Sequence, residues 1–464
     1  MRLASLLTFA LAAAFGSAAA QDGLTRRDTS TAAIAAEAYV YGYPAVTQFV
    51  ARRIATNVAK PLENGRAPIN QFGHVLRLSS ASIRDSSGVW VTMLPATAWL
   101  DLTSEPIVVH TPPIRGRYYF LEVFDSWMNS IASIGTRTTG DTAQTFALTG
   151  PNWKGGTPAG IKTEYKSLSN FVRIVAQIQT KSTRDTDAVN AIQRGMRTTP
   201  MSSFGKPFSW LAGEPNPAIN MKTSVAMQVN DLTTEQYFDL LLRILQTDPP
   251  ANVDSSLLAR MALVGMKPGQ DFVQTKFDSA TWAAFQAGAR AGFARIAERA
   301  RTVRTTRNGW QSLTVCGAYA GDHLLRAAVA FVEPDCVLSE DALRPTTFVD
   351  ASGRHLNGAY RYVLHFPRGA PPVRGFWSLN MYDVDHFLVN NPLSRYALRS
   401  WDDFKRNPDG SIDVVIQQGP PAGSAQANWL PAPPGSFILT LELMRPDARA
   451  LEGTWAPPAV RRIR

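Results

Sequence analysis

The spacing of hydrophobic and polar residues changes character several times along the chain. Residues 31–54 are rich in alanine and other helix formers behind a Ser/Thr start, which predicts a long helix that Pro44 kinks or splits. Residues 75–179 contain short β-branched and aromatic runs separated by Gly, Pro and Asn, which predicts antiparallel strands. Residues 187–332 return to helical spacing, and strands reappear from about residue 360.

This succession predicts a multi-domain α+β protein with β-rich ends and a helical middle. At about 150 residues per domain, a chain of 464 residues corresponds to two or three domains. We expect an N-terminal antiparallel β-sandwich domain with a leading helix over residues 31–186 and a helical domain over residues 187–345. A C-terminal β-sandwich or jelly-roll domain over residues 346–464 closes the chain.

The first twenty residues have the composition of a secretory signal peptide. Arg2 precedes an apolar run over residues 3–15, and the small residues Ala18 and Ala20 follow. This order predicts cleavage after Ala20 and a periplasmic or secreted mature protein. The apolar run is shorter than the ~18 residues needed to cross a bilayer, and no later stretch reaches that length, so we expect no transmembrane segment.

Composition excludes some classes of protein and leaves the ligand open. With 45% hydrophobic and 18% charged residues, the chain has the composition of a folded globular protein. The formal net charge of +10 is spread along the sequence instead of forming a basic patch, so we expect no nucleic-acid partner. A small polar or polymeric ligand and a homo-oligomer both remain compatible with this composition.

The two cysteines are the basis of one structural prediction. Cys316 and Cys336 are the two cysteines of the chain, and disulfides persist in the oxidising compartments outside the cytoplasm. We therefore predict that they form a disulfide. The alternative is a pair of buried thiols.

The histidines show no i, i+4 pairing, no Cys/His cluster has zinc spacing, and nucleotide-binding and serine-elbow signatures are absent. We therefore predict neither a metal site nor a cofactor.

Several strings along the chain together resemble those of a bacterial protein family. They are EAYVYGYP, AWLDLTSEPIVV, GRYYFLEVFDSWMN with IGTRTTG, LNGAYRYVLHF, PPVRGFWSLNMYD with FLVNNPLSRYAL, and NWLPAPPG with GTWAPP. In this order they resemble exported bacterial proteins that pair domain of unknown function 1254 (N-terminal) with domain of unknown function 1214 (C-terminal). The resemblance implies an N-terminal immunoglobulin-like β-sandwich, a central helical domain and a C-terminal jelly-roll β-sandwich, and it implies no established reaction.

The chain departs from the pattern of that family at two places. Similar members usually carry an Asn-x-Asp-Thr-x-Tyr string just before AWLDL. The corresponding residues here are Trp90, Thr92, Met93 and Pro95. Near the end, Glu442 and Met444 stand where an arginine and an aromatic residue are more usual. If the string carries family chemistry, this chain lacks that chemistry or does something different.

Carboxylates are the candidates for catalysis. In NMYDVDHF, Asp383 and Asp385 share one face if the strand continues, about 6.6 Å apart at about 3.3 Å per residue. This separation falls between those of retaining and inverting glycosidases, about 5–9.5 Å, so it allows a hydrolase without selecting one. The alternative is that both residues belong to a turn, because D-V-D-H followed by N-N-P has turn composition.

A second group of candidates lies in the string RYYFLEVFDSW. Asp125 is a further catalytic candidate, and Glu122 is another acid close to it in sequence. Arg117 and Trp127, together with Tyr118, are the residue types that bind a sugar or aromatic ligand by bidentate hydrogen bonds and stacking.

Three residues near the first carboxylate pair are candidate ligand-binding residues. Arg395 follows a predicted turn at NNP. Two roles are open for it: binding a substrate anion, or forming a buried ion pair with Asp383. We favour the ion pair. Tyr382 and Trp377 lie in the preceding strand string, and their alternative role is packing in the sandwich core.

Two functional hypotheses follow from these residues. The first is an exported hydrolase that uses acidic residues on an envelope or extracellular polar or carbohydrate substrate. The second is a non-catalytic ligand-binding or assembly protein of the cell envelope. A cleft in which Asp383 or Asp125 meets Arg395 and aromatic side chains favours the enzyme. The same carboxylates held in turns or ion pairs favour the binding protein, because the fold alone supports both roles.

Overall fold

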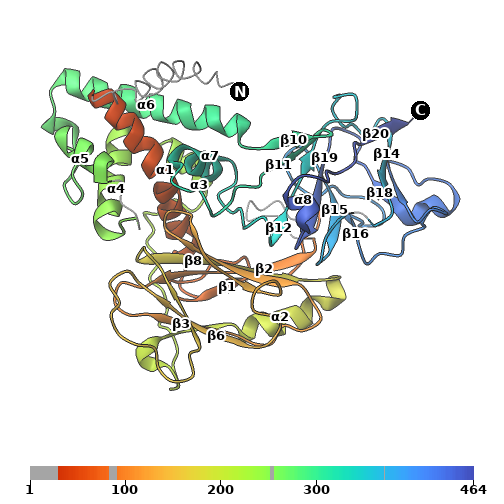
Figure 1. Cartoon of the computed structure of the whole chain (residues 1–464), viewed down its shortest axis with the longest axis horizontal. Coiled ribbons are helices and arrows are strands. Elements are labelled where there is room, and N and C mark those ends of the chain that lie inside the picture. Colours follow the sequence, from red (N-terminus) through yellow and green to blue (C-terminus); the bar gives the residue numbers. More distant parts are fainter. Residues whose placement is uncertain (1–29, 83–90, 251–254, 370, 464) are drawn as a thin grey trace, which may run out of the picture.

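The computed structural model of the chain describes residues 30–82, 91–250, 255–369 and 371–463 (Figure 1). The predicted signal peptide, residues 1–20, lies outside these ranges. Within them the chain is a mixed α+β protein with several largely antiparallel sheets, as predicted. No helix in these ranges is long and apolar enough to cross a bilayer.

A long buried helix, α1 (Thr31–Thr56), leads the described chain. Its N-terminus is capped by the Ser30 hydroxyl, which accepts a hydrogen bond from the backbone N–H of Ala33 at 3.2 Å. Pro44 lies inside the helix without ending it, so the predicted split is wrong. Proline in a helix interior costs about 3 kcal/mol, but α1 is buried along most of its length and tertiary packing outweighs that cost.

The N-terminal sandwich consists of two sheets that share one core. Their strand orders are β1-β2-β8-β4-β5 and β7-β6-β3-β9, and every pair is antiparallel except β6 with β7. The bounds are β1 Phe72–His74, β2 Met93–Asp101, β3 Ile107–Thr111, β4 Tyr119–Asp125, β5 Ser130–Gly135, β6 Gln144–Thr149, β7 Thr163–Lys166, β8 Phe171–Gln179 and β9 Arg197–Pro200. Leu94, Leu121 and Ile174 of the first sheet share the core with Val109 and Phe146 of the second.

The helical part is built around α1, which contacts each of the helices α3 to α7 (Figure 1). Their bounds are α3 Val225–Asn230, α4 Thr234–Thr247, α5 Ser255–Leu263, α6 Ser279–Thr302 and α7 His323–Val332. A Cβ atom at Gly288 of α6 would lie 2.5 Å from the Ala32 carbonyl oxygen, and one at Gly292 would lie 2.7 Å from the Tyr39 Cβ. Glycine at these two positions therefore allows α1 and α6 to approach closely.

Shorter helices connect the larger parts. Helix α2 (Thr186–Gly195) contributes Val189 to the core of the N-terminal sandwich. Helix α8 (Ala448–Leu451) lies near the C-terminus. The 3₁₀ turns are η1 Thr183–Asp185, η2 Met201–Ser203, η3 Gln274–Lys276 and η4 Gly423–Asn428.

The C-terminal part is a second pair of sheets around a shared core. One sheet has the order β10-β11-β13-β19-β15-β16, with β12 also paired to β19, and the other has the order β18-β17-β14-β20. The bounds are β10 Thr305–Arg307, β11 Trp310–Ser312, β12 Ala342–Leu343, β13 Thr346–Thr347, β14 Arg361–Phe366, β15 Trp377–Tyr382, β16 Ala397–Arg399, β17 Ile412–Gln417, β18 Trp429–Pro431, β19 Ile438–Met444 and β20 Arg461–Ile463. Leu379 and Leu441 of the first sheet meet Leu364 and Val414 of the second.

Three segments pack outside the domain that the sequence predicts for them. Helix α1 shares its core with the helical part and not with the strands that follow it. Strand β9 joins the N-terminal sandwich although it lies beyond residue 186, and β10 to β12 join the C-terminal sheet although they precede residue 346. The predicted domain boundaries stay predictions.

Cys316 and Cys336 form a disulfide, as predicted, with their Cα atoms 5.9 Å apart. Both residues are buried in the core around α1, one on each side of α7 in the sequence. The bridge therefore ties the start and the end of the α7 segment to the helical core.

Replacing both cysteines by serine is expected to lower the free energy of unfolding. The bond closes a loop with a sequence separation of 20, and a loop of this length contributes about 3 kcal/mol by restricting the unfolded chain. Denaturant unfolding of the Cys316→Ser/Cys336→Ser protein, compared with the oxidised and the reduced wild type, measures the loss. An unchanged unfolding free energy in both the variant and the reduced protein contradicts the prediction.

Candidate functional site

The carboxylate pair predicted for catalysis lies in a turn. Strand β15 ends at Tyr382, so the assumption that the strand continues to Asp385 is wrong. The Asp383 Oδ1 atom accepts hydrogen bonds from the backbone N–H groups of Asp385 at 3.0 Å and Phe387 at 2.8 Å. Asp385 itself is exposed. This geometry is that of a carboxylate that stabilises a turn, the alternative that the sequence left open.

The three neighbouring candidates contact protein groups. The Arg395 guanidinium donates to the backbone carbonyl oxygens of Gln426 at 3.0 Å and Trp429 at 2.9 Å. The predicted pairing of Asp383 with Arg395 stays a prediction. Trp377 packs in the core of the C-terminal sandwich, and Tyr382 is buried on the outer face of the same strand. Their roles in ligand binding stay predictions.

Substituting Asp383 by alanine is expected to destabilise the protein by about 1–3 kcal/mol, because two backbone N–H groups lose a charged acceptor. The exposed Asp385 is the matched control, and its alanine variant is expected to stay within about 0.5 kcal/mol of wild type. Denaturant unfolding of the two variants gives the comparison. Equal losses from both substitutions would show that the turn does not depend on Asp383.

Asp125 and Trp127 lie together at the end of β4, fully buried. The carboxylate of Asp125 accepts from the backbone N–H groups of Trp127 and Asn129 and from Asn129 Nδ2, at 2.8–2.9 Å. Burial raises the pKa of Asp125. The Asn129 donors and the Arg326 charge lower this pKa, but their effect is smaller than that of burial. The Trp127 indole N–H donates to the Asp248 carbonyl oxygen at 3.1 Å. Asp125 therefore stabilises the turn after β4, and Trp127 connects that turn to the end of α4.

Arg117 lies far from Asp125, because it precedes the first residue of β4 and Asp125 is the last residue of that strand. A separation of eight residues along extended chain corresponds to about 26 Å at about 3.3 Å per residue. The Arg117 guanidinium forms a bidentate pair with Asp185, with N–O distances of 2.8 and 3.0 Å, and also donates to the Gln179 carbonyl oxygen. The structure therefore does not bring these two candidates into one site.

Glu122, the other acid of this strand, faces the segment that follows the disulfide. Its carboxylate accepts hydrogen bonds from the Ser130 hydroxyl at 2.7 Å and from the Leu338 N–H at 3.3 Å. Burial raises the pKa of Glu122 to about 7, and these two donors only partly offset that rise. The Tyr118 hydroxyl, just before β4, lies within hydrogen-bond distance of two Asp341 oxygens, the backbone carbonyl and Oδ1.

The Glu122→Gln variant is expected to change how stability depends on pH. A carboxyl whose pKa is raised on folding binds its proton more tightly in the folded state, so its ionisation lowers the free energy of unfolding as pH rises from about 4.5 through about 7. The glutamine variant cannot ionise, so it should gain stability relative to wild type at about pH 8 compared with about pH 4.5. Thermal unfolding across this range checks the sign.

The exposed Glu63 supplies the control for that experiment, because Glu63→Gln should leave the pH dependence unchanged. A difference between Glu122→Gln and wild type that is the same at both ends of the pH range would contradict the prediction.

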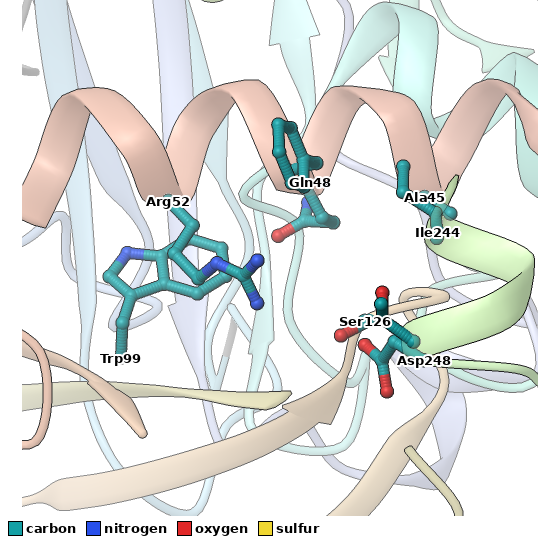
Figure 2. A pocket seen from close by; sticks show the side chains of 9 residues that line it. Ala45, Gln48, Arg52, Trp99, Ser126, Ile244 and Asp248 are labelled. Carbon is teal, nitrogen blue, oxygen red and sulfur yellow. The ribbon is translucent and has the colours of Figure 1, made fainter. Parts of the chain in front are cut away.

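A small cavity lies between α1, the end of the N-terminal sandwich and the C-terminus of α4 (Figure 2). It is lined by Ala45, Gln48, Phe49, Arg52, Trp99, Ser126, Ile244, Thr247 and Asp248. Ala45, Gln48 and Arg52 lie on one face of α1 because residues three and four apart share a face of a helix. Figure 2 shows Gln48 and Arg52 reaching from α1 toward the side on which Ser126 and Asp248 lie.

Two polar groups from α1 have unused hydrogen-bonding capacity in this cavity. Gln48 is buried, and its Oε1 atom has no hydrogen-bond partner among the described residues. The Arg52 guanidinium stacks over the Phe171 ring, 3.3 Å from its centroid, and has no carboxylate oxygen within 4 Å in the part of the chain that the structure describes. Burial lowers the pKa of Arg52 to about 10, with the charges of Asp248 and Asp101 opposing that change. The arginine is nevertheless protonated at neutral pH.

Asp248 supplies the opposite charge in the cavity. Its carboxylate accepts a hydrogen bond from the backbone N–H of Asn170. Burial raises the pKa of Asp248 to about 6, while the Ser126 hydroxyl, the Asn170 N–H and the Arg52 charge lower it. At neutral pH the cavity therefore holds one positive and one negative side chain that attract each other without forming a direct ion pair.

The size of the cavity limits what it can hold. The volume that a water-sized molecule can occupy within it is about 10 Å³, which is about the space of a single water. A larger ligand can reach the cavity only from the side that opens to solvent, and a polymer segment does not fit inside. Within the described ranges, no group of three or more His, Cys, Asp or Glu side chains is arranged to hold a metal ion.

The two departures from the family pattern meet at the contact between the two sandwiches. The Glu442 carboxylate accepts hydrogen bonds from Thr92 at 2.8 Å and Ser378 at 3.0 Å. Met93 and Met444 share an apolar cluster. Thr92 and Glu442 are 350 residues apart in sequence, so only the fold brings these substitutions together. Pro95 lies inside β2, and Trp90 is outside the described residues.

The α1 cavity is absent from the sites predicted from the sequence. Gln48 and Arg52 fall within the predicted helix, and the sequence signal is that they are four residues apart and therefore share one face of a helix. Asp248 carries no motif, and its place in the cavity depends on its hydrogen bonds with Trp127, just after β4, and Asn170, just before β8.

Two family models match the chain. The model described as protein of unknown function DUF1254 matches residues 69–200, and the model described as protein of unknown function DUF1214 matches residues 341–448. This pairing and its order confirm the resemblance found in the sequence. No curated protein matches the chain.

Two solved structures are similar to the whole chain. One is the VPA0106 protein from Vibrio parahaemolyticus, with a TM-score of 0.72, 20% sequence identity, and coverage of 94% of this chain and 100% of that chain. At this identity the likeness concerns the fold alone. The other is an uncharacterized protein from Burkholderia cenocepacia, with a TM-score of 0.42, 10% identity and 94% coverage of each chain, on which no argument rests.

Proposed function

We propose that this chain, a member of the proteins that pair domain of unknown function 1254 with domain of unknown function 1214, binds a small carboxylic acid without transforming it. The α1 cavity is the proposed site. The observation that carries the proposal is the Arg52 guanidinium, which lines the cavity and has no ion-pair partner among the described residues.

A bound carboxylate would give the partly buried Arg52 a direct ion-pair partner. Burying a charge without a partner is unfavourable, and the usual solutions are an ion pair or a change of protonation. Arginine does not deprotonate at neutral pH even with its lowered pKa of about 10. Its planar guanidinium matches a carboxylate with two parallel N–H···O bonds, so a carboxylate is the ligand group that complements it best.

The other side of the cavity accepts hydrogen bonds. Gln48 Oε1 has no partner among the described residues, and Asp248 is mostly ionised at neutral pH because its raised pKa is about 6. A ligand with a hydroxyl or ammonium group beside its carboxylate would donate to these acceptors. We therefore propose a short hydroxy or amino acid, which would approach these groups from the side on which the cavity opens to solvent.

The placement of the predicted carboxylates supports binding over hydrolysis. Asp383 accepts hydrogen bonds within a turn, Asp385 is exposed, and Asp125 is buried with three hydrogen-bond donors. None of the three lines the α1 cavity or the larger cavity beside α8 in the C-terminal part. General acid and base groups must reach the bond that reacts, and these carboxylates share neither cavity.

Three finer assignments complete the proposal. The N-terminal sandwich is proposed to be immunoglobulin-like and the C-terminal one a jelly roll, on the strength of the resemblance and of paired sheets around one core. The protein is proposed to be periplasmic or secreted, since residues 1–20 have signal-peptide composition. We also propose that copies of this protein associate with one another in the cell envelope.

The test is calorimetric titration of the full mature chain with glycolate, glycine and acetate. We expect saturable binding of glycolate or glycine, and weaker binding of acetate, which lacks the second donor. Arg52→Gln should weaken binding at least tenfold, because the variant loses a charge-assisted pair worth about 1.5–3 kcal/mol.

The matched control is Arg53→Gln, because Arg53 is the exposed neighbour on the same helix and lies outside the cavity. This variant should bind as wild type does. Absence of binding by all three acids, or equal binding by the Arg52 and Arg53 variants, would overturn the proposed function.

A further inference from the structure

A second and larger cavity lies in the C-terminal part, between the β10–β11 hairpin, strands β12 and β19, and the segment around α8 (Figure 1). The volume that a water-sized molecule can occupy within it is about 210 Å³, somewhat below the range of about 300–1,000 Å³ of small-molecule sites, and the cavity opens to solvent. Leu343 and Leu443 contribute apolar lining from the sandwich core. This cavity has room for a ligand that the α1 cavity excludes.

Two side chains of opposite charge line this cavity without pairing. Arg307 and Glu452 both belong to the lining, and no ion pair within 4 Å joins them in the part of the chain that the structure describes. Arg307 Nη1 donates to the backbone carbonyl oxygen of Gly453, which holds the guanidinium at the rim and leaves its other nitrogens available. Glu452 is exposed. One donor group and one acceptor group, with no net charge between them, suit a neutral polar ligand better than an ion.

Trp455 supplies a flat apolar surface beside these charges. Its backbone N–H donates to the Arg449 carbonyl oxygen at 2.8 Å, which fixes the residue next to α8. The side chain is half-buried against the sandwich core, and its ring stacks on no other aromatic ring among the described residues. Its indole N–H also has no hydrogen-bond partner within those residues.

The remaining polar groups of the lining are hydroxyls. Thr305, Ser312 and Thr314 line the cavity from β10, β11 and the chain that follows them. Hydroxyl groups both donate and accept hydrogen bonds, so they match a ligand whose own polar groups are hydroxyls.

We propose that this cavity is a binding site for a neutral saccharide of one or two rings. A sugar ring has an apolar C–H face, which stacks on an indole, and a rim of hydroxyls, which pairs with a carboxylate and a guanidinium. A fatty or aromatic acid would place its carboxylate near Glu452, and a purely apolar ligand would desolvate Arg307 and Glu452 without giving them partners. This inference is independent of the carboxylate site on α1.

The experiment is saturation-transfer NMR followed by titration calorimetry on the full mature chain. The probes are methyl β-glucoside, N-acetylglucosamine, maltose and cellobiose, with octanoate as the charged amphipathic comparison. We expect at least one of the four saccharides to bind and octanoate not to compete with it. Trp455→Ala should weaken that binding about tenfold or more, and Glu452→Gln about three- to tenfold, which corresponds to the loss of a stacking surface and of one charged acceptor.

Two further measurements keep the test decisive. Glu452 is exposed, so Glu452→Gln tests the site even if Trp455→Ala fails to fold, and the exposed Glu63→Gln is the matched control that should bind normally. Binding by none of the four saccharides, displacement of the saccharide by octanoate, or unchanged affinity in a folded Trp455→Ala and in Glu452→Gln each overturns the proposal.

Discussion

The close packing of α1 against α6 is the contact around which the helical part of the molecule is built. A methyl group at Gly288 or Gly292 would overlap atoms of α1, so the approach of the two helices depends on their missing Cβ atoms. With α6 and α7 against one side of α1, the end of the N-terminal sandwich covers another. The helix is therefore buried along most of its length, and two of its polar side chains, Gln48 and Arg52, lie at the boundary between helices and strands.

The order of elements could be predicted from the sequence, but the packing of several elements could not. Periodicity identifies the long helices and the two strand-rich regions because long periodic runs carry a strong local signal. A helix buried on nearly all sides has no single polar face that indicates its partner, so sequence order alone groups α1 with the strands that follow it. Strands of two or three residues, such as β10 to β12, are defined by their distant pairing partners and leave little local pattern.

The candidate site is the weaker part of the sequence interpretation, and the reasons are geometric. The argument for Asp383 and Asp385 requires two more residues of strand, but the strand ends at Tyr382 and the Asp383 carboxylate accepts a hydrogen bond from the Asp385 N–H within a turn. Conversely, Thr92 and Glu442 stand out in the sequence only as departures from a family pattern, yet they form a direct contact between the two sandwiches. Motif comparison locates positions that matter to the contact between the domains, but it cannot show that they touch each other. Nothing in the local sequence around Asp248 indicates that it shares a cavity with Arg52.

Coupling between Arg52 and Asp248 decides which acid the α1 cavity would prefer. A carboxylate placed on Arg52 favours the charged guanidinium, and its own negative charge also acts on the Asp248 carboxylate, whose pKa burial has already raised to about 6. A simple monocarboxylate therefore gains at Arg52 and loses by repulsion from Asp248 at neutral pH. A neighbouring hydroxyl or ammonium group on the ligand turns that loss into a hydrogen bond or an attraction. The same pair of charges that makes the cavity attractive for an acid thus selects among acids by the group that lies beside the carboxylate.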